Sequence, residues 1–165
     1  MQNLFSYGQV TPEIIQKLKE ILGDNNVSQD GEKIEAYSHD EVLACMYKRK
    51  YNADALIFPE STEQVSAVMK LASAENIPVT PRGAGTGLSG GDLPVYGGLL
   101  MCFEKMNHIL ELDEENLSVT VEPGVVTAEI TRLAAAHNLL YAGDPCSGDA
   151  SYIGGNIAEN AGGNK

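Results

Sequence analysis

Two clusters of glycine are the feature of this sequence that most restricts its fold. Of the 17 glycines in the 165-residue chain, five lie between Gly83 and Gly91 and six between Gly143 and Gly163. Closely spaced glycines lose much backbone entropy on folding, so we expect each cluster to serve a tight turn or a close approach. The chain as a whole has an ordinary globular composition, with 43% hydrophobic and 21% charged residues, and a length typical of one domain.

The first cluster has Gly85, Gly87 and Gly90 in the order G-x-G-x-x-G, directly after a predicted strand. In a dinucleotide-binding Rossmann fold, a helix begins at these glycines and its N-terminus holds the pyrophosphate. Residues 92–98 contain a proline and two more glycines without a helical pattern, which disfavours an NAD-linked Rossmann enzyme. We therefore predict a non-helical nest, in which successive N–H groups point at a pyrophosphate. A tight surface loop that binds nothing is the alternative.

The second cluster follows turn signals at Asp144-Pro145 and Ser147-Gly148. Gly154-Gly155 would let backbone lie against a flat ligand, although close packing between a helix and a backbone segment is the alternative. Together the clusters predict one large ligand with a pyrophosphate at one end and a ring at the other. Charge and hydroxyl donors for the phosphates are expected from Arg82, Thr86 and Ser89.

The surrounding pattern predicts an α+β fold with a mixed sheet. Apolar runs predict strands at 55–58, 77–80 and 99–103, and a hairpin formed by 109–112 and 119–121. The strand–helix–strand order over 55–80 predicts a parallel pair with a right-handed crossover.

Three apolar stripes predict helices that begin after the capping hydroxyls of Thr11, Ser61 and Thr127, and Gln64 completes a capping box with Ser61. Residues 24–50 are mixed and polar, with a loop expected at 37–40. We therefore expect 1–50 to form a helical leader packed on a domain that spans 51–165.

Charge and cysteine content exclude several classes of protein. Eleven basic and 23 acidic residues give a net charge of −12, which disfavours nucleic acid and anionic membranes as partners. No apolar run approaches the roughly 18 residues of a membrane span. Cys45, Cys102 and Cys146 are far apart and form no CxxC, so neither a disulfide framework nor a zinc site is expected, and a reducing cytoplasm is the predicted location.

Three segments, Pro78–Gly91, Asn107–Val126 and Asp144–Gly163, resemble FAD-linked oxidases of the vanillyl-alcohol oxidase and p-cresol methylhydroxylase type. The likeness is greatest to the branch that contains glycolate oxidase and D-lactate dehydrogenase. It implies oxidation of a 2-hydroxy acid with hydride transfer to the flavin N5. Electrons would then pass to an iron–sulfur subunit, an electron-transfer flavoprotein or a quinone.

The resemblance also implies which residues bind FAD. The phosphate loop would be formed by Arg82, Gly83, Ala84, Gly85, Thr86, Gly87, Ser89 and Gly90. The flavin and its ribityl chain would lie against Asp144, Pro145, Gly148, Ser151, Gly154, Gly155, Asn156 and Ala158. The adenine half would lie nearer to Pro59, Glu122, Pro123 and Gly124.

Two departures from the family pattern qualify this expectation. Thr86 stands where covalent relatives carry a histidine, so non-covalent FAD is expected. The family sequence continues beyond Lys165 with a substrate-binding cap, so no catalytic residue or metal ligand is assigned here, and these 165 residues alone are expected to be inactive. A non-catalytic module that binds FAD or another nucleotide is the alternative.

Other reactive side chains have ordinary explanations. His137 is expected to be a packed histidine with a backbone partner, and His108 to be exposed beside a strand. Glu114 and Glu115 are expected in a solvated turn. Cys146 lies near the predicted flavin, but a buried, unreactive thiol is the expected state.

Overall fold

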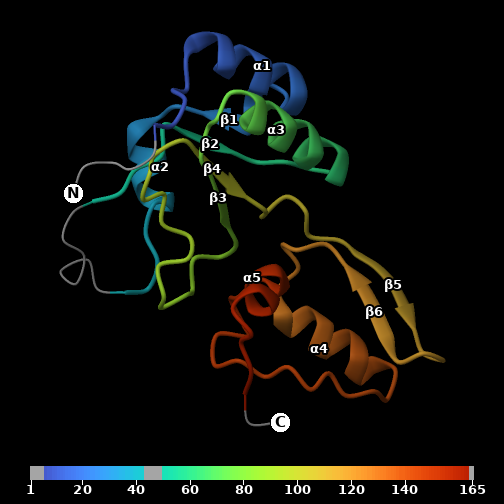
Figure 1. The fold of residues 1–165 in the computed structure, drawn as a ribbon. Helices are drawn as coiled ribbons and strands as arrows, with labels where there is room; N and C mark the ends of the chain where they lie inside the picture. Colours follow the sequence, from blue (N-terminus) through green and yellow to red (C-terminus); the bar gives the residue numbers. More distant parts are fainter. Residues whose placement is uncertain (1–5, 43–49, 164–165) are drawn as a thin grey trace. The chain divides into compact units, whose positions relative to one another are not determined.

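The computed structural model describes residues 6–42 and 50–163 of the chain. The described residues form two compact units (Figure 1). Unit 1 comprises the chain up to Pro81 together with Gly87–Cys102, and unit 2 comprises Arg82–Thr86 and Phe103 to the C-terminus. The boundary between the two units therefore crosses the first glycine cluster.

Unit 1 is built around a four-stranded sheet, counted over the described residues, in the order β1-β2-β4-β3. Its strands are β1 (Val27–Ser28), β2 (Ala55–Ile57), β4 (Leu99–Cys102) and β3 (Val79–Arg82), whose last residue belongs to unit 2. β1 pairs with β2 antiparallel and β2 with β4 parallel. The mixed sheet confirms the predicted fold class.

The predicted parallel pairing of residues 55–58 with 77–80 is wrong. Ala55 lies opposite Leu99 and Ile57 opposite Met101, so β4 lies between β2 and β3. β2 and β4 are buried along their whole lengths, which a central strand requires. Neighbours in sequence are usual partners in a sheet, and here a later strand takes the central place.

Helices cover the sheet of unit 1. α1 (Pro12–Leu22) and α3 (Thr62–Ala74) lie side by side (Figure 1), and α1 buries Ile14, Ile15, Leu18 and Leu22. α2 (Gly31–Tyr37) was not expected; Asp30 caps it by accepting from the N–H groups of Glu32 and Lys33. Its Ile34 packs in one cluster with Ala53, Leu56, Phe58, Leu100 and Cys102. Because side chains alternate along a strand, Ala55, Ile57, Leu99 and Met101 face the opposite side.

The segment 24–37 has more regular structure than the sequence suggests. Besides α2, it contributes β1 and a short 3-10 helix, Asp24–Asn26. The Asn26 amide donates to the Leu22 carbonyl oxygen, and the Phe58 N–H donates to the Asn26 carbonyl oxygen. These bonds join the end of α1 to the end of β2.

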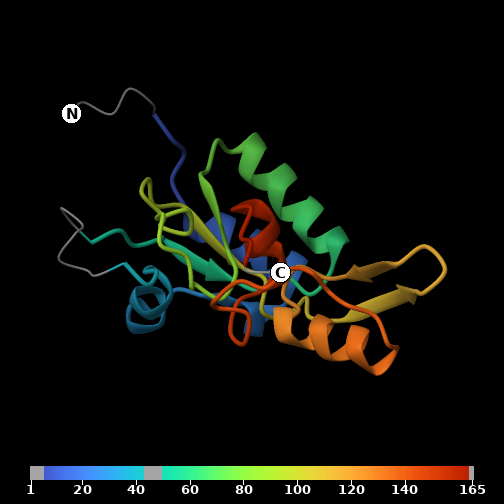
Figure 2. The same cartoon turned by 90° about the horizontal axis from the view of Figure 1, so that it is seen from below.

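Unit 2 contains the predicted hairpin, β5 (Ile109–Asp113) and β6 (Ser118–Val121), with Asp113 opposite Ser118. α4 (Thr127–Ala136) runs alongside the hairpin in Figures 1 and 2. Val125, Ile130 and Ile153 form the buried cluster of this unit, with Ile109, Val119, Val121 and Tyr141 packed around it. α5 (Ile153–Ala158) is a short helix in the second glycine cluster.

The sequence suggested that Thr127 caps α4, and this prediction is wrong. The N-cap residue is Val126, and the Thr127 hydroxyl donates instead to the Ser151 carbonyl oxygen at 3.1 Å. Of the helices in the described parts of the chain, none has both the length and the apolar character needed to cross a bilayer.

The capping box predicted for α3 gives a stability test. Ser61 Oγ accepts from the Gln64 N–H at 3.3 Å, and Gln64 Oε1 accepts from the Glu60 N–H at 2.7 Å. We expect Ser61→Ala to lower the free energy of unfolding by about 1 kcal/mol and Ser61→Gly by only a few tenths. Ser73→Ala, on an exposed position of the same helix, is the control and should be neutral or slightly stabilising. Urea denaturation measures all three, and equal effects of Ser61→Ala and Ser73→Ala would contradict the capping role.

Candidate functional site

The first glycine cluster is non-helical, as predicted. Residues 83–91 form bends and turns, and no helix begins between them and β4. Arg82–Thr86 belongs to unit 2 and Gly87–Gly91 to unit 1. Each half therefore has its own supporting contacts.

The half in unit 2 is built around a buried cation. Arg82 is 7% exposed, and its carbonyl oxygen accepts from the Phe103 N–H at 3.1 Å. Gly85 has φ +75°, and a Cβ built there would lie 2.1 Å from Nη2 of Arg82. The guanidinium therefore lies directly against the backbone of its own loop. A side chain at position 85 would be strained by the positive φ and would displace the guanidinium.

This half of the loop lies beside the second glycine cluster. A Cβ on Gly83 would be in van der Waals contact with the side chain of Tyr152, 3.7 Å from its Cβ. Tyr152 is the N-cap residue of α5. Two segments that are about 70 residues apart, and that the sequence linked only through their glycines, thus meet within unit 2.

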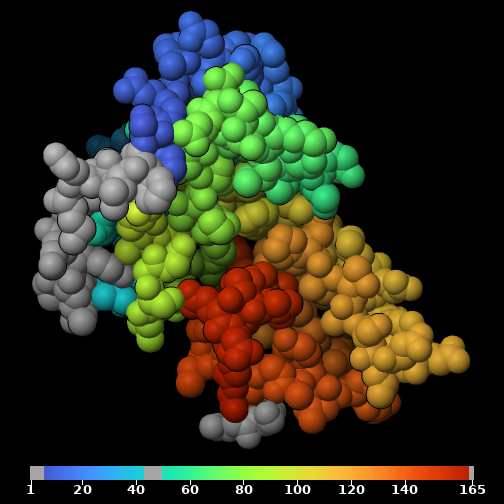
Figure 3. All heavy atoms as spheres, viewed as in Figure 1, coloured from blue at the N-terminus to red at the C-terminus, as the bar shows by residue number. Residues whose placement is uncertain are grey.

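The adjacent glycines of α5 have different roles. A Cβ on Gly154 would lie 2.7 Å from the Cβ of Pro123, and the Gly154 N–H donates to the Pro123 carbonyl oxygen at 2.9 Å. Gly154 therefore allows α5 to pack closely on the turn Glu122–Gly124. A Cβ on Gly155 would meet nothing within 4 Å, and Gly155 and Ala158 are exposed. Figure 3 shows α5, in red, at the surface of its unit. Within α5, the exposed Gly155 and Ala158 offer a low surface to a flat ligand.

A buried polar group holds α5 to α4. The Asn156 amide donates to Thr127 Oγ1 and, at 3.1 Å, to Ser151 Oγ. Ser151 is 2% exposed, Thr127 1% and Asn156 9%. The side chains of the predicted site residues Ser151 and Asn156 thus point inward, where their hydrogen bonds satisfy one another.

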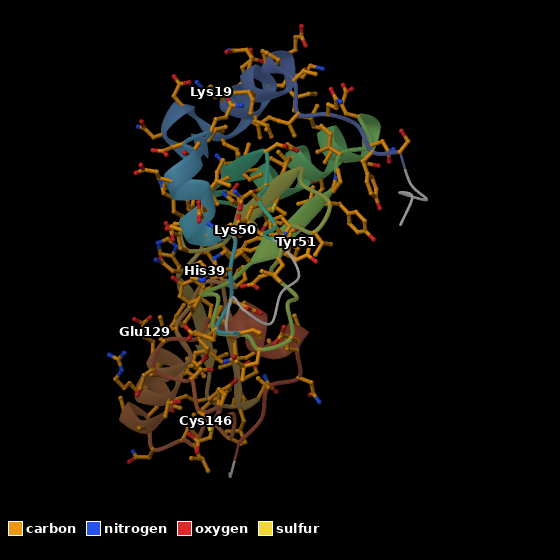
Figure 4. All side chains as sticks on the ribbon, turned by 90° about the vertical axis from the view of Figure 1, so that its left-hand side faces the viewer. Lys19, His39, Lys50, Tyr51, Glu129 and Cys146 are labelled. Carbon is orange, nitrogen blue, oxygen red and sulfur yellow. The ribbon has the colours of Figure 1, made fainter. Side chains whose placement is uncertain are left out.

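The segment before α5 is a compact turn. The Gly148 N–H donates to the Pro145 carbonyl oxygen at 2.9 Å, and the Ala128 N–H donates to the Gly148 carbonyl oxygen at 3.0 Å. Cys146 is exposed (Figure 4), so the expectation of a buried thiol is wrong. The turn directs residue 146 outward, whereas Cys102 is buried in β4. Cys45 lies outside the described residues.

The half of the loop in unit 1 is held by a residue that the sequence analysis did not single out. Asp40 Oδ2 accepts from the Gly90 N–H at 3.0 Å, and the Glu41 N–H donates to the Gly87 carbonyl oxygen at 3.2 Å. Asp40 is 6% exposed. Ser89, between the two tethered glycines, is exposed. Pro59, which was predicted near the adenine, is fully buried at the end of β2.

Carboxylate–histidine pairs lie at both ends of the hairpin. Glu122 Oε2 accepts from the backbone N–H of His108 at 2.8 Å and lies 2.7 Å from its Nδ1. These contacts, the backbone hydrogen bond first, hold the pKa of Glu122 below its usual value, although partial burial opposes the shift. His108 is exposed, as predicted.

The prediction for His137 is wrong. Its Nδ1 lies 2.7 Å from Glu114 Oε1, a side-chain partner, and the ring is exposed at the C-cap of α4. Over the residues that the structure describes, no group of His, Cys, Asp or Glu side chains is placed to hold a metal ion.

The site so described fits an anion with an attached flat group. It joins a buried guanidinium, a Cβ-free backbone at Gly85, and the open surface of Gly155 and Ala158 within one unit. In a chain of net charge −12, a local anion site depends on such placed groups and on backbone amides.

Known proteins are similar to this chain in sequence and in fold. A family described as "FAD binding domain" matches residues 53–165. Glycolate oxidase subunit GlcD of Bacillus subtilis (strain 168) is 39% identical over 154 residues, covering 93% of this chain and 32% of that protein. D-lactate dehydrogenase of Anaerostipes hadrus is 42% identical over 159 residues, covering 96% and 32%.

The structure of p-cresol methylhydroxylase with substrate bound aligns with a TM-score of 0.62 at 25% identity, covering 76% of this chain and 24% of that one. The chain thus spans about a third of the length of the curated relatives that it matches.

Glu122 gives a test of the contacts at the base of the hairpin. Its pKa is lower in the folded protein than in the unfolded chain, so the unfolded state takes up protons first on acidification. The stabilisation is present above the unfolded pKa, near 4.5, and is lost as the pH falls through the folded pKa.

We therefore expect Glu122→Gln to lower the free energy of unfolding more at pH 6 than at pH 3, measured by urea denaturation at both values. Glu115→Gln, on the exposed hairpin turn, serves as control and should show a smaller difference. A Glu122→Gln effect independent of pH would refute the ionic contribution.

Proposed function

Because the chain belongs to the FAD-binding domain family, we propose that it holds FAD in a flavin-dependent enzyme that oxidises a 2-hydroxy acid such as glycolate or D-lactate. The single observation that carries the proposal is the packing of the buried Arg82 guanidinium against the backbone of Gly85. Relatives at about 40% identity, one named as a glycolate oxidase subunit and one as D-lactate dehydrogenase, support the choice of substrate class.

In this proposal the loop Gly83–Thr86 binds the FAD pyrophosphate through backbone N–H groups, and Arg82 provides positive charge beneath it. Backbone amides suit this role because a chain this acidic would otherwise repel an anion. Gly155 and Ala158 offer the low surface for the flavin and its ribityl chain. Thr86 occupies the position of the attachment histidine in covalent relatives, so we propose that FAD is bound non-covalently.

Several other predicted residues of unit 2 act as a scaffold for these contacts. The turn Glu122–Gly124 packs closely against α5 at Gly154. Ser151 and Asn156 fix α5 on α4 through Thr127. A rigid scaffold matters because a displacement of about 1 Å in a bound cofactor changes reactivity strongly.

When bound, FAD supplies the acceptor, N5, for the hydride that leaves the α-carbon of the 2-hydroxy acid. The substrate also loses its hydroxyl proton and becomes a 2-oxo acid. We assign no proton acceptor to this chain. Electrons would pass on to an iron–sulfur subunit, an electron-transfer flavoprotein or a quinone, in a reducing cytoplasm.

Absorption spectroscopy of the complete gene product tests the proposed function. We expect the purified protein to show bound-flavin bands, to release all flavin into the supernatant on acid precipitation, and to lose its visible absorbance when D-lactate or glycolate is added without oxygen. Flavin that is not reduced by either acid would indicate a binding module without turnover. Absence of flavin even after incubation with FAD would contradict the proposal.

Gly85→Val is expected to abolish FAD binding while leaving the protein folded, because the new side chain would displace the Arg82 guanidinium and strain the backbone. Gly23→Val is the matched control, since Gly23 also has a positive φ, +85°, but no atom within 4 Å of a Cβ. Flavin content after gel filtration and the circular dichroism spectrum should be measured for both variants. A folded Gly85→Val protein with stoichiometric flavin would disprove the role of the loop.

A further inference from the structure

We propose that Asp40 is the positioning residue of the glycine loop and that it sets the affinity for FAD through the segment Gly87–Gly91; the inference rests on the proposed function. Asp40 lies three residues after the end of α2 and is 6% exposed. Its two carboxylate oxygens have different partners: Oδ1 accepts from the Val42 N–H and Oδ2 from the Gly90 N–H, both at 3.0 Å. One side chain thus joins the backbone of Val42 to the loop at Gly90, which lies 50 residues after Asp40.

A second bond makes this connection rigid. The Glu41 N–H donates to the Gly87 carbonyl oxygen at 3.2 Å. The loop is therefore held at both Gly87 and Gly90 by two consecutive residues, 40 and 41. Gly90 itself has φ +79°, a conformation that glycine adopts freely and that local sequence does not enforce. The carboxylate supplies this restraint, and hydrogen bonds to a charged acceptor are about twice as strong as neutral ones.

The restraint bears on ligand binding because glycine-rich backbone is costly to order. A loop that is already held before the ligand arrives avoids that cost at the time of binding. The Gly90 N–H already donates to the Asp40 carboxylate, so it does not serve as a donor to a ligand phosphate. We infer that phosphate binding relies on amides earlier in the loop and that Asp40 keeps the second half of the loop in the conformation that binding requires.

The same unit contains a matched pair of groups outside the glycine cluster. Asp54 Oδ2 accepts from the Gly98 N–H at 2.7 Å, and Gly98 also has a positive φ, +71°. This pair likewise joins an aspartate to a glycine 44 residues later. Asp54 thus makes the same kind of hydrogen bond as Asp40, at a place where no ligand contact is predicted. Replacing the Asp54 side chain should therefore change the stability of the protein and not its affinity for FAD.

The test compares Asp40→Ala, Asp40→Asn and Asp54→Ala with the wild type in the complete gene product. FAD would be removed and titrated back while flavin fluorescence is followed, and each melting temperature would be recorded. We expect FAD affinity to fall about tenfold or more in Asp40→Ala and less in Asp40→Asn, because the amide keeps one acceptor oxygen. Asp54→Ala should lower the melting temperature with FAD affinity within twofold of wild type.

Hydrogen exchange followed by mass spectrometry gives a readout besides affinity. Peptides that cover Gly87–Gly91 in the FAD-free protein should exchange faster in Asp40→Ala than in wild type and should be unchanged in Asp54→Ala. If Asp40→Ala does not fold, Asp40→Asn carries the same comparison.

The outcomes separate this inference from the proposed function. A wild-type protein that does not bind FAD overturns the proposed function and with it this inference. Wild-type binding with equal affinity in folded Asp40 variants overturns the role of Asp40 alone, as does an equal loss in Asp54→Ala. Tighter binding by Asp40→Asn would also overturn it, because the carboxylate would then act by repelling the phosphates.

Discussion

The contact between the Arg82 guanidinium and the backbone at Gly85 is the interaction on which the account of this molecule depends. A chain with net charge −12 has a field that repels anions, so an anion site needs a local source of positive potential. In the proposed site, the buried Arg82 guanidinium beside the backbone of Gly83–Thr86 supplies it, since charge acts over a short distance and in a lower dielectric there. The burial of Arg82 and the positive φ of Gly85 are thus two parts of one arrangement.

The rest of unit 2 holds that loop beside the exposed surface of α5. Gly154 brings α5 onto the turn at Pro123, and the Thr127–Ser151–Asn156 group locks α5 to α4. These are packing and hydrogen-bonding roles, whereas the adjacent Gly155 is open to solvent. Two glycines in a row therefore differ: Gly154 shows the close packing that was one alternative for the second cluster, whereas the contact of Gly155 with a flat ligand stays a prediction.

Local patterns predicted much of this fold. The proline and glycines after the first cluster excluded a Rossmann helix, Ser61 and Gln64 marked the start of α3, and alternating apolar residues marked the hairpin. Contacts between distant segments were beyond such patterns. The position of β4 between β2 and β3, the bond from Asp40 to Gly90, and the turn of Thr127 toward Ser151 each join residues about 20 or more apart. Local hydrophobic period and propensity carry no information on such pairings.

Nuclear magnetic resonance of the complete gene product, with glycine selectively labelled with nitrogen-15, tests the central claim most directly. The FAD-free protein would be titrated separately with ADP, which carries the pyrophosphate, and with riboflavin, which lacks it. We expect ADP to shift the amide signals of Gly83 and Gly85 and riboflavin to leave them in place, while the signal of Gly23 responds to neither. Shifts of Gly83 and Gly85 with riboflavin but not with ADP would contradict it.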